Sequence, residues 1–299
     1  MQTGNKAGVV FRTVGGFFFV KSEGKQYRCV LRGTLKKSTE VLVGDRVVLL
    51  PTAPGAGVIE GVEERSNRLL RPPVANVGKA LVVLALDDPP PNLNLLDRIL
   101  VQVEDAGVQP VVCLNKIDLA PSGEVERIAN ELLRPYRLAG YKVYSVSSKE
   151  GWGIAEVRCE LADSVTVLAG QSGVGKSSIL NAVEPGLSLS TGEVSRRTKR
   201  GRHTTRQVEL MPLTVGGWVV DTPGFSALEL PEVEPEKLIY LFPELWGPSL
   251  RCRFPNCGHE SERDCAVRQA VEQGTVASSR LASYLEMARE LKERRRYKA

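Results

Sequence analysis

A glycine-rich stretch at residues 168–178, Leu-Ala-Gly-Gln-Ser-Gly-Val-Gly-Lys-Ser-Ser, constrains the fold more than any other part of the chain. It follows the largely apolar run 165–168 and precedes residues 179–183, Ile-Leu-Asn-Ala-Val, so the order is strand, loop, helix. Its spacing G-x-x-x-x-G-K-S is that of a phosphate-binding loop, with Gly170, Gly175, Lys176 and Ser177 at the defining positions. Glycines let backbone N–H groups curl around phosphates, and the helix N-terminus adds its dipole. The stretch therefore predicts a nucleotide-binding α/β domain rather than a plain glycine-rich turn.

We expect the whole loop to contact the nucleotide: Gly170, Gln171, Ser172, Gly173, Val174, Gly175, Lys176, Ser177 and Ser178. Lys176 would act catalytically by reaching the β- and γ-phosphates, and the Ser177 hydroxyl would ligate Mg²⁺.

The composition is that of an ordinary globular protein, with 299 residues, 42% of them apolar and 25% charged, which predicts two domains, or three if some are small. No apolar run reaches the roughly 20 residues of a membrane span, and the first residues lack a signal peptide's apolar core. We expect a cytoplasmic monomer with no membrane partner. The net charge is +5, and basic residues gather at 196–206 and 294–298. Either cluster alone could be solvated surface, but together, in a phosphate-binding protein, they favour a polyanionic partner such as RNA.

Residues 8–65 contain five short strand patterns, at 9–12, 16–20, 26–31, 45–50 and 57–60, separated by glycine turns. They predict an OB-fold β-barrel over residues 1–66. The aromatic side chains of Phe17, Phe18, Phe19 and Tyr27 could stack on bases, although alternate members of the set are expected to fill the barrel core.

From residue 67 the pattern changes to strands alternating with helices. Strands are predicted at 80–86, 110–114, 141–146, 165–168, 207–211 and 218–221, and helices at 94–106, 124–138 and 153–162. This order predicts a doubly wound α/β domain over residues 67–228, with its ligand at the carboxyl ends of the strands.

The predicted strand at 110–114 ends in a guanine-reading sequence, N-K-x-D, formed by Asn115, Lys116, Ile117 and Asp118. A carboxylate such as Asp118 can accept two hydrogen bonds from N1–H and N2–H₂ of guanine, a donor pair that adenine does not offer. Asn115 can tie the loop, and the Lys116 stem can cover a face of the base. Ser147 and Ser148, after the strand at 141–146, fit a second base-contacting loop or a plain turn.

Two later segments complete a GTPase pattern. Asp221, in the sequence D-T-P-G, follows a buried strand and can hold Mg²⁺, while the Gly224 N–H can meet the γ-phosphate. Thr204 and Thr205 are alternative further Mg²⁺ ligands. Many GTPases orient the attacking water with a glutamine after this glycine, but this chain has Phe225, so we assign that catalytic role to His203.

The order of the motifs is unusual, because the guanine-reading loop precedes the phosphate loop. The sequence therefore predicts a circularly permuted GTPase domain whose last motif leads directly into a C-terminal module at 229–299.

That module carries three cysteines and a histidine within fourteen residues, Cys252, Cys257, His259 and Cys265. These predict a closed, structural zinc site. Residues 279–298 predict an amphipathic helix with a basic end, so the module should be mostly helical.

With these motifs, the chain resembles the ribosome small subunit-dependent GTPase A family over essentially its whole length. The resemblance implies GTP hydrolysis stimulated by the small ribosomal subunit during late maturation, with rRNA contacts by the flanking domains. It also implies a catalytic histidine in the H-T-T segment, here His203. Potassium-activated relatives carry asparagine at the position of Gly173, and this departure argues against direct K⁺ coordination.

Two other functions remain open from the sequence. One is an rRNA-binding assembly module that uses GTP only as a conformational switch. The other is an ATPase, which Asp118 argues against.

Overall fold

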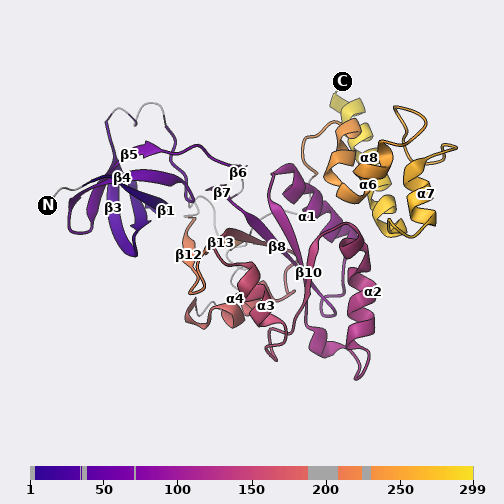
Figure 1. Cartoon of the computed structure of the whole chain (residues 1–299), viewed down its shortest axis with the longest axis horizontal. Coiled ribbons are helices and arrows are strands. Elements are labelled where there is room, and N and C mark those ends of the chain that lie inside the picture. Colours follow the sequence, from indigo (N-terminus) through magenta and orange to yellow (C-terminus); the bar gives the residue numbers. More distant parts are fainter. Residues whose placement is uncertain are drawn as a thin grey trace.

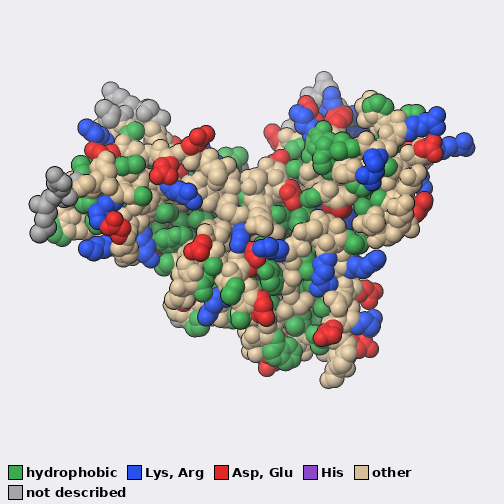
Figure 2. All heavy atoms as spheres, viewed as in Figure 1, with side chains coloured by type: hydrophobic (Ala, Val, Ile, Leu, Met, Phe, Trp, Pro, Cys, Tyr) green, Lys and Arg blue, Asp and Glu red, His purple; other side chains and the backbone are tan. Residues whose placement is uncertain are grey.

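The computed structural model describes residues 4–33, 35, 39–70, 72–187, 208–223 and 230–298. Figure 1 shows an N-terminal barrel, a central sheet flanked by helices, and a helical C-terminal module, with the barrel and that module on opposite sides of the sheet. Basic and acidic side chains are interspersed over the visible face (Figure 2). Among the described residues, no helix combines the length and the apolar character needed to span a bilayer.

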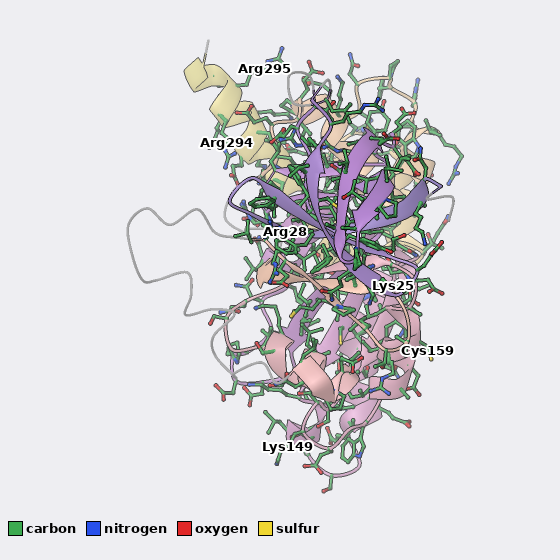
Figure 3. The ribbon with its side chains drawn as sticks, turned by 90° about the vertical axis from the view of Figure 1, so that its left-hand side faces the viewer. Lys25, Arg28, Lys149, Cys159, Arg294 and Arg295 are labelled. Atoms are coloured by element: carbon green, nitrogen blue, oxygen red, sulfur yellow. The ribbon has the colours of Figure 1, made fainter. Side chains whose placement is uncertain are left out.

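The barrel has five strands, β1 (Lys6–Val14), β2 (Phe17–Ser22), β3 (Lys25–Leu31), β4 (Arg46–Ala53) and β5 (Ala56–Val62). They close in the order β1-β2-β3-β5-β4, which confirms the predicted N-terminal barrel. Tyr27 is buried in its core, and Phe18 packs against that core. Phe17 is exposed instead, with the Arg28 guanidinium 4.3 Å from its ring centre. Arg28 and Lys25 lie on the barrel surface seen in Figure 3.

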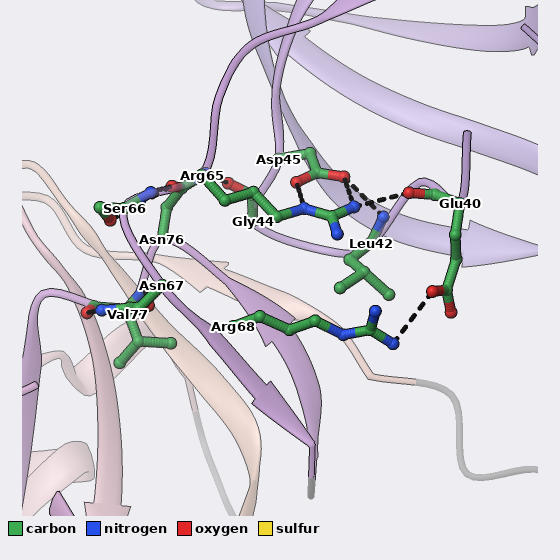
Figure 4. A network of polar contacts seen from close by, with 10 residues as sticks. All are labelled: Glu40, Leu42, Gly44, Asp45, Arg65, Ser66, Asn67, Arg68, Asn76 and Val77. Atoms are coloured by element: carbon green, nitrogen blue, oxygen red, sulfur yellow. Dashed lines mark hydrogen bonds and ion pairs between the residues drawn. The ribbon is translucent and has the colours of Figure 1, made fainter. Parts of the chain in front are cut away.

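After the barrel the chain forms a short hairpin of β6 (Arg68–Leu70) and β7 (Pro73–Ala75), which no sequence pattern predicted. Hydrogen bonds connect the barrel to the segment that follows it and connect the two ends of the hairpin (Figure 4). The Arg65 guanidinium donates to both oxygens of the buried Asp45 carboxylate, at 2.7 and 2.9 Å. The Asn67 side chain donates to the Val77 carbonyl at 2.7 Å and accepts from the Val77 N–H at 2.9 Å.

The central sheet has the order β10-β9-β8-β11-β13-β12. Its parallel strands are β8 (Lys79–Ala85), β9 (Gln109–Asn115), β10 (Lys142–Ser145), β11 (Val165–Ala169) and β13 (Trp218–Pro223), and β12 (Leu210–Pro212) is antiparallel. Of the predicted strand at 207–211, Leu210 and Met211 pair with β13, whereas Glu209 forms a bridge to the barrel. Because side chains alternate along β8, Val82 and Leu84 face one apolar core and Leu81 and Val83 the other.

Helices cover both faces of the sheet, as predicted. Helices α1 (Leu93–Asp105) and α2 (Val125–Leu138) pack in the first core. Helices α3 (Ile154–Glu160) and α4 (Lys176–Val183) pack in the second. Short 3₁₀ turns, η2 (Ile117–Leu119) and η3 (Pro185–Leu187), follow β9 and α4.

The barrel also contacts the outer strand of this sheet. Arg12 of β1 forms a β-bridge with Glu209, just before β12, and their side chains pair at 3.6 Å. Phe11 stacks on Trp218 of β13 with ring centres 6.2 Å apart and an interplanar angle of 11°.

The C-terminal module consists of η4 (Pro235–Leu241), α6 (Pro243–Ser249), α7 (Ala266–Glu272) and α8 (Ser278–Lys298). The predicted helix at 279–298 is α8, and the shorter helices agree with a mostly helical module. Its core includes Val101 of α1, so the module packs directly against the central domain. At this contact the fully buried Arg280 of α8 pairs with Asp97 of α1 at 2.7 Å and with Glu244 of α6 at 2.6 Å.

Candidate nucleotide site and metal centre

The predicted site segments lie along one edge of the sheet. β9 ends at Asn115, β10 ends shortly before Ser147, and β11 ends immediately before Gly170. These strands are parallel and lie on either side of β8, so their carboxyl ends share one edge. Ligands of open α/β sheets bind at this edge.

The first and last glycines of the phosphate loop lie so close to neighbouring atoms that no side chain fits at either position. Gly170 has a φ of +127°, and a Cβ there would lie 2.1 Å from the Val83 carbonyl oxygen. Gly175 has a φ of +92°, and a Cβ there would lie 2.2 Å from Nδ2 of Asn115. Helix α4 begins directly after Gly175, and no side-chain hydrogen bond caps it. The first N–H groups of α4 are therefore available for an anion.

Lys176 lies folded over this loop. Its ammonium donates to the carbonyl oxygens of Gly170 and Gln171, both at 2.8 Å. Burial lowers the pKa of Lys176 to about 8, because the ammonium is removed from water with no carboxylate of the described residues paired to it. A negatively charged phosphate group at the loop would supply the missing counter-charge. Ser177, the next residue, is also buried.

Asn115 connects three loops of the site. Its Nδ2 donates to the Val174 carbonyl in the phosphate loop at 2.9 Å, and its Oδ1 accepts from the Ser148 N–H at 3.1 Å. The Ser147 hydroxyl in turn donates to Oδ1 of Asp118 at 2.6 Å. The predicted guanine loop, the serine loop and the phosphate loop are thus one hydrogen-bonded unit.

Lys116 has a φ of +61°, and its ammonium donates to the Asp88 carbonyl. Ile117 is buried beneath the loop.

Residues 87–91, which no motif predicted, also border the site. Besides the contact from Lys116 to Asp88, Pro89 lies against the phosphate loop, 3.4 Å from where a Cβ on Gly173 would be. A signal was present, because this segment follows the carboxyl end of the buried strand β8, where the rule for ligand placement applies equally.

His203, Thr204, Thr205, Gly224 and Phe225 lie outside the described residues. Asp221 lies in β13 near its carboxyl end, and only its backbone is described.

The four predicted metal ligands come together in the C-terminal module. The ligand atoms of Cys252, Cys257, His259 and Cys265 all lie within 4.8 Å of one another. Nδ1 of His259 is 3.7 Å from Sγ of Cys252 and 3.4 Å from Sγ of Cys265, and those two sulfurs are 3.9 Å apart. With metal–sulfur bonds of about 2.3 Å, a tetrahedral site has sulfur–sulfur edges of about 3.8 Å. The cluster therefore fits a tetrahedral metal ion held by four protein ligands.

Comparisons with known proteins place these features in a family. The family described as RsgA GTPase matches residues 62–231, more than half of the chain, and the family described as RsgA N-terminal domain matches residues 7–59. The chain belongs to the RsgA GTPase family. This confirms the resemblance drawn from the motifs.

RsgA relatives span nearly the whole chain. The protein named "Small ribosomal subunit biogenesis GTPase RsgA" from Geobacillus thermodenitrificans is 46% identical over 289 residues, which cover 96% of this chain and 98% of that protein. The protein of the same name from Bacillus subtilis is 42% identical and covers 96% and 98%.

Two solved structures resemble the RsgA-type fold of this chain. YjeQ from Thermotoga maritima has a TM-score of 0.84 at 36% identity, covering 96% of this chain and 99% of that chain. YloQ, described as a circularly permuted GTPase, has a TM-score of 0.83 at 38% identity and covers 97% and 96%. The predicted circular permutation is thereby confirmed.

Proposed function

We propose that this chain is a GTPase that binds the small ribosomal subunit and acts in its late maturation. It hydrolyses GTP to GDP and phosphate, is stimulated by the subunit, and works as a monomer in the cytoplasm. Its relatives named for small-subunit biogenesis cover almost all of its length, so the proposal extends to the flanking modules. We propose their boundaries at 1–66, 67–228 and 229–299.

One observation carries the nucleotide assignment. Asn115 hydrogen-bonds both to the phosphate loop at Val174 and to the loop of Ser148. A guanine held by Asp118 and phosphates held by 170–178 would therefore be bound by one connected set of loops.

In this assignment the chain's own groups stabilise the charge that develops on the γ-phosphate. Lys176 and the loop N–H groups supply positive electrostatic potential, and the Gly224 N–H meets the γ-phosphate. Mg²⁺ would be held by Ser177 and Asp221 with either Thr204 or Thr205, and it neutralises charge on the β- and γ-phosphates when bound. His203 would orient the attacking water, since Phe225 cannot.

Zinc is the metal that we assign to Cys252, Cys257, His259 and Cys265. Three thiolates and one imidazole are the donor set that tetrahedral structural zinc prefers.

The test is hydrolysis of GTP and of ATP by the purified chain, with and without small ribosomal subunits. We expect the chain to hydrolyse GTP but not ATP. The rate of GTP hydrolysis should rise many-fold with subunits and should be abolished by Lys176→Ala. Asp118→Ala should weaken GTP binding far more than ATP binding, and equal losses would contradict guanine reading by this carboxylate.

The second candidate is an rRNA-binding module whose nucleotide only sets its conformation, and the phenylalanine at 225 favours it. Tight GTP binding with no acceleration by subunits would establish that candidate and remove His203 from the catalytic residues.

A further inference from the structure

Residues 87–91, with the sequence Asp-Asp-Pro-Pro-Pro, connect β8 to α1 beside the nucleotide loops. We call them the proline segment. The residues on either side of it are hydrogen-bonded: the Leu86 N–H donates to the Asn115 carbonyl at 2.9 Å, and Oδ1 of Asn92 accepts from the Leu95 N–H at 3.0 Å. Three consecutive prolines restrict the backbone between these two points. The proline segment is therefore a stiff wall of the site.

The proline segment packs against the phosphate loop. Pro89 lies 3.4 Å from where a Cβ on Gly173 would be. Residues 90–92 and three residues of the phosphate loop are among those that line a cavity of only about 20 Å³, which has room for about one water molecule. The position of the segment is thus tied to that of the phosphate loop.

The same segment contacts the predicted guanine loop at Lys116. The Lys116 ammonium donates to the Asp88 carbonyl and lies 3.9 Å from a carboxylate oxygen of the same residue. Both residues have a left-handed backbone, with φ values of +61° and +44°. This conformation costs free energy for any residue with a Cβ, and it persists where surrounding contacts fix it, often at ligand clamps. The contact between the two residues therefore holds the Lys116 side chain in one place.

We propose that Asp88 is a positioning residue for Lys116, and that the proline segment in this way slows the release of GDP. The inference rests on the proposed nucleotide site, in which the Lys116 stem covers a face of guanine. A stem whose ammonium is already held has lost much of its rotamer freedom before the base binds, so binding costs less conformational entropy. A stem that is not held loses that freedom on binding, and the nucleotide then dissociates faster.

The sign of the effect separates this role from a simple effect of charge. The phosphates of GDP are negative, so a nearby carboxylate that acted only through its charge would repel the nucleotide, and its removal would slow release. Removal of a carboxylate that holds Lys116 should speed release instead. The Asp88 side chain is 95% exposed, and exposed ion pairs contribute little, so we expect a change of about two- to fivefold.

The experiment is a double-mutant cycle on the rate of GDP release from the full chain with Mg²⁺ present. A fluorescent GDP analogue is displaced by excess unlabelled GDP and followed by stopped flow. Asp88→Asn keeps the size of the side chain and suits a positive φ, and it should speed release about two- to fivefold. Lys116→Met keeps an apolar stem without the ammonium. In that background Asp88→Asn should have no further effect.

Asp163→Asn is the matched control. Asp163 is also exposed and also has a positive φ, +54°, but it lies just before β11, at the opposite edge of the sheet from the nucleotide loops. This variant should release GDP at the wild-type rate. The unfolding midpoint should be the same for both asparagine variants and the wild type, so that any change in release is not a loss of stability.

Slower or unchanged release from Asp88→Asn would overturn the proposal, and so would an equal acceleration in the Lys116→Met background or in Asp163→Asn. Lys116→Ala, which removes the stem as well, tests the nucleotide site itself. Release from Lys116→Ala at the wild-type rate would contradict the covering of the base by Lys116, and the inference with it. Faster release from Lys116→Ala without any effect of Asp88→Asn would leave the proposed site standing and overturn only the positioning role.

Discussion

Both polar atoms of the Asn115 side chain form hydrogen bonds within the protein. The side chain is therefore held in one position, which limits the size of the residues beside it. The amide donates toward the phosphate loop at Val174 and accepts from Ser148, so it lies in the narrow space beside Gly175. A side chain at residue 175 would displace it.

We therefore expect Gly175→Ala to lower affinity for GDP and GTP about tenfold or more, because overpacking typically costs about 1–3 kcal/mol. Equilibrium titration with a fluorescent GDP analogue measures the change. Gly123→Ala is the matched control: Gly123 also has a positive φ, +80°, but nothing lies within 4 Å of an added Cβ. Equal losses in the two variants would mean that backbone strain, not the contact with Asn115, is responsible.

The pKa of Lys176 predicts a pH dependence of nucleotide binding. Burial lowers this pKa to about 8, so the free protein loses the ammonium charge as pH rises through that value. A bound triphosphate favours the charged form, so binding takes up a proton in this range. We expect GTP affinity to fall between pH 7 and pH 9, as measured by calorimetry in two buffers of different ionisation enthalpy.

Lys176→Arg supplies the control, because a guanidinium stays charged throughout this range. Whatever its affinity at pH 7, this variant should lose the pH dependence. A wild-type affinity that is constant up to pH 9 would contradict the lowered pKa.

Much of the site could be predicted because its motifs are local. The spacing of Gly170, Gly175 and Lys176 specifies a phosphate loop within eight residues, and 115–118 specifies a base-reading loop within four. The bond from Asn115 to Val174 spans 59 residues, and the contact from Lys116 to Asp88 depends on which strands are neighbours. No local pattern contains that information.

Helix α1 belongs to two cores at once. Leu96 and Ile99 pack against the sheet, while Val101 and Asp97 face the C-terminal module. Asp97 accepts from Arg280 and, at 3.0 Å, from the Tyr136 hydroxyl of α2, so one buried carboxylate joins three helices.

Removing one partner of a buried ion pair leaves an uncompensated charge, at a cost of about 3–5 kcal/mol. We expect Arg280→Ala to destabilise the chain by about that amount, and limited proteolysis to release the C-terminal module first. Chemical denaturation followed by far-ultraviolet circular dichroism measures the loss. Arg127→Ala is the control, because Arg127 pairs with Glu124 and Glu131 on the exposed surface of α2, so its unfolding midpoint should not move.

Amphipathic helices such as α1 were predictable from their apolar period, and buried strands such as β8 from their continuous apolar run. The helices η4 and α6 were not, because prolines at 235, 243 and 248 interrupt the pattern. Packing around Phe242 and Leu245 stabilises these short turns instead. The β6–β7 hairpin could not be predicted because each of its strands has only three residues, too few to show an alternating pattern.

Specific contacts join the three parts of the molecule. The metal cluster nevertheless lies far from the nucleotide loops in sequence, and its residues belong to the core of the C-terminal module. Cys265 belongs to the C-terminal core, with Cys252 and Cys257 packed against it.

Removal of the metal by a chelator should therefore lower the thermal stability of the C-terminal module and leave GDP affinity within about twofold of its original value. Scanning calorimetry and nucleotide titration measure the two effects. Cys257→Ser should reproduce the destabilisation, whereas Cys159→Ser should not, because Cys159 is an exposed thiol outside the cluster. Loss of nucleotide binding together with the metal would show that the two sites are coupled.

The bridge between Arg12 and Glu209 affects which partners the outer strand of the central sheet can pair with. β12 is the outer strand of the central sheet, and an uncovered outer strand can pair with the same strand of another molecule. The barrel covers this edge at Arg12, and Phe11 packs on Trp218 behind it. Residues 6–62 leave the ribosome before β12 is synthesised. The barrel can therefore fold before the strand whose edge it covers has been made.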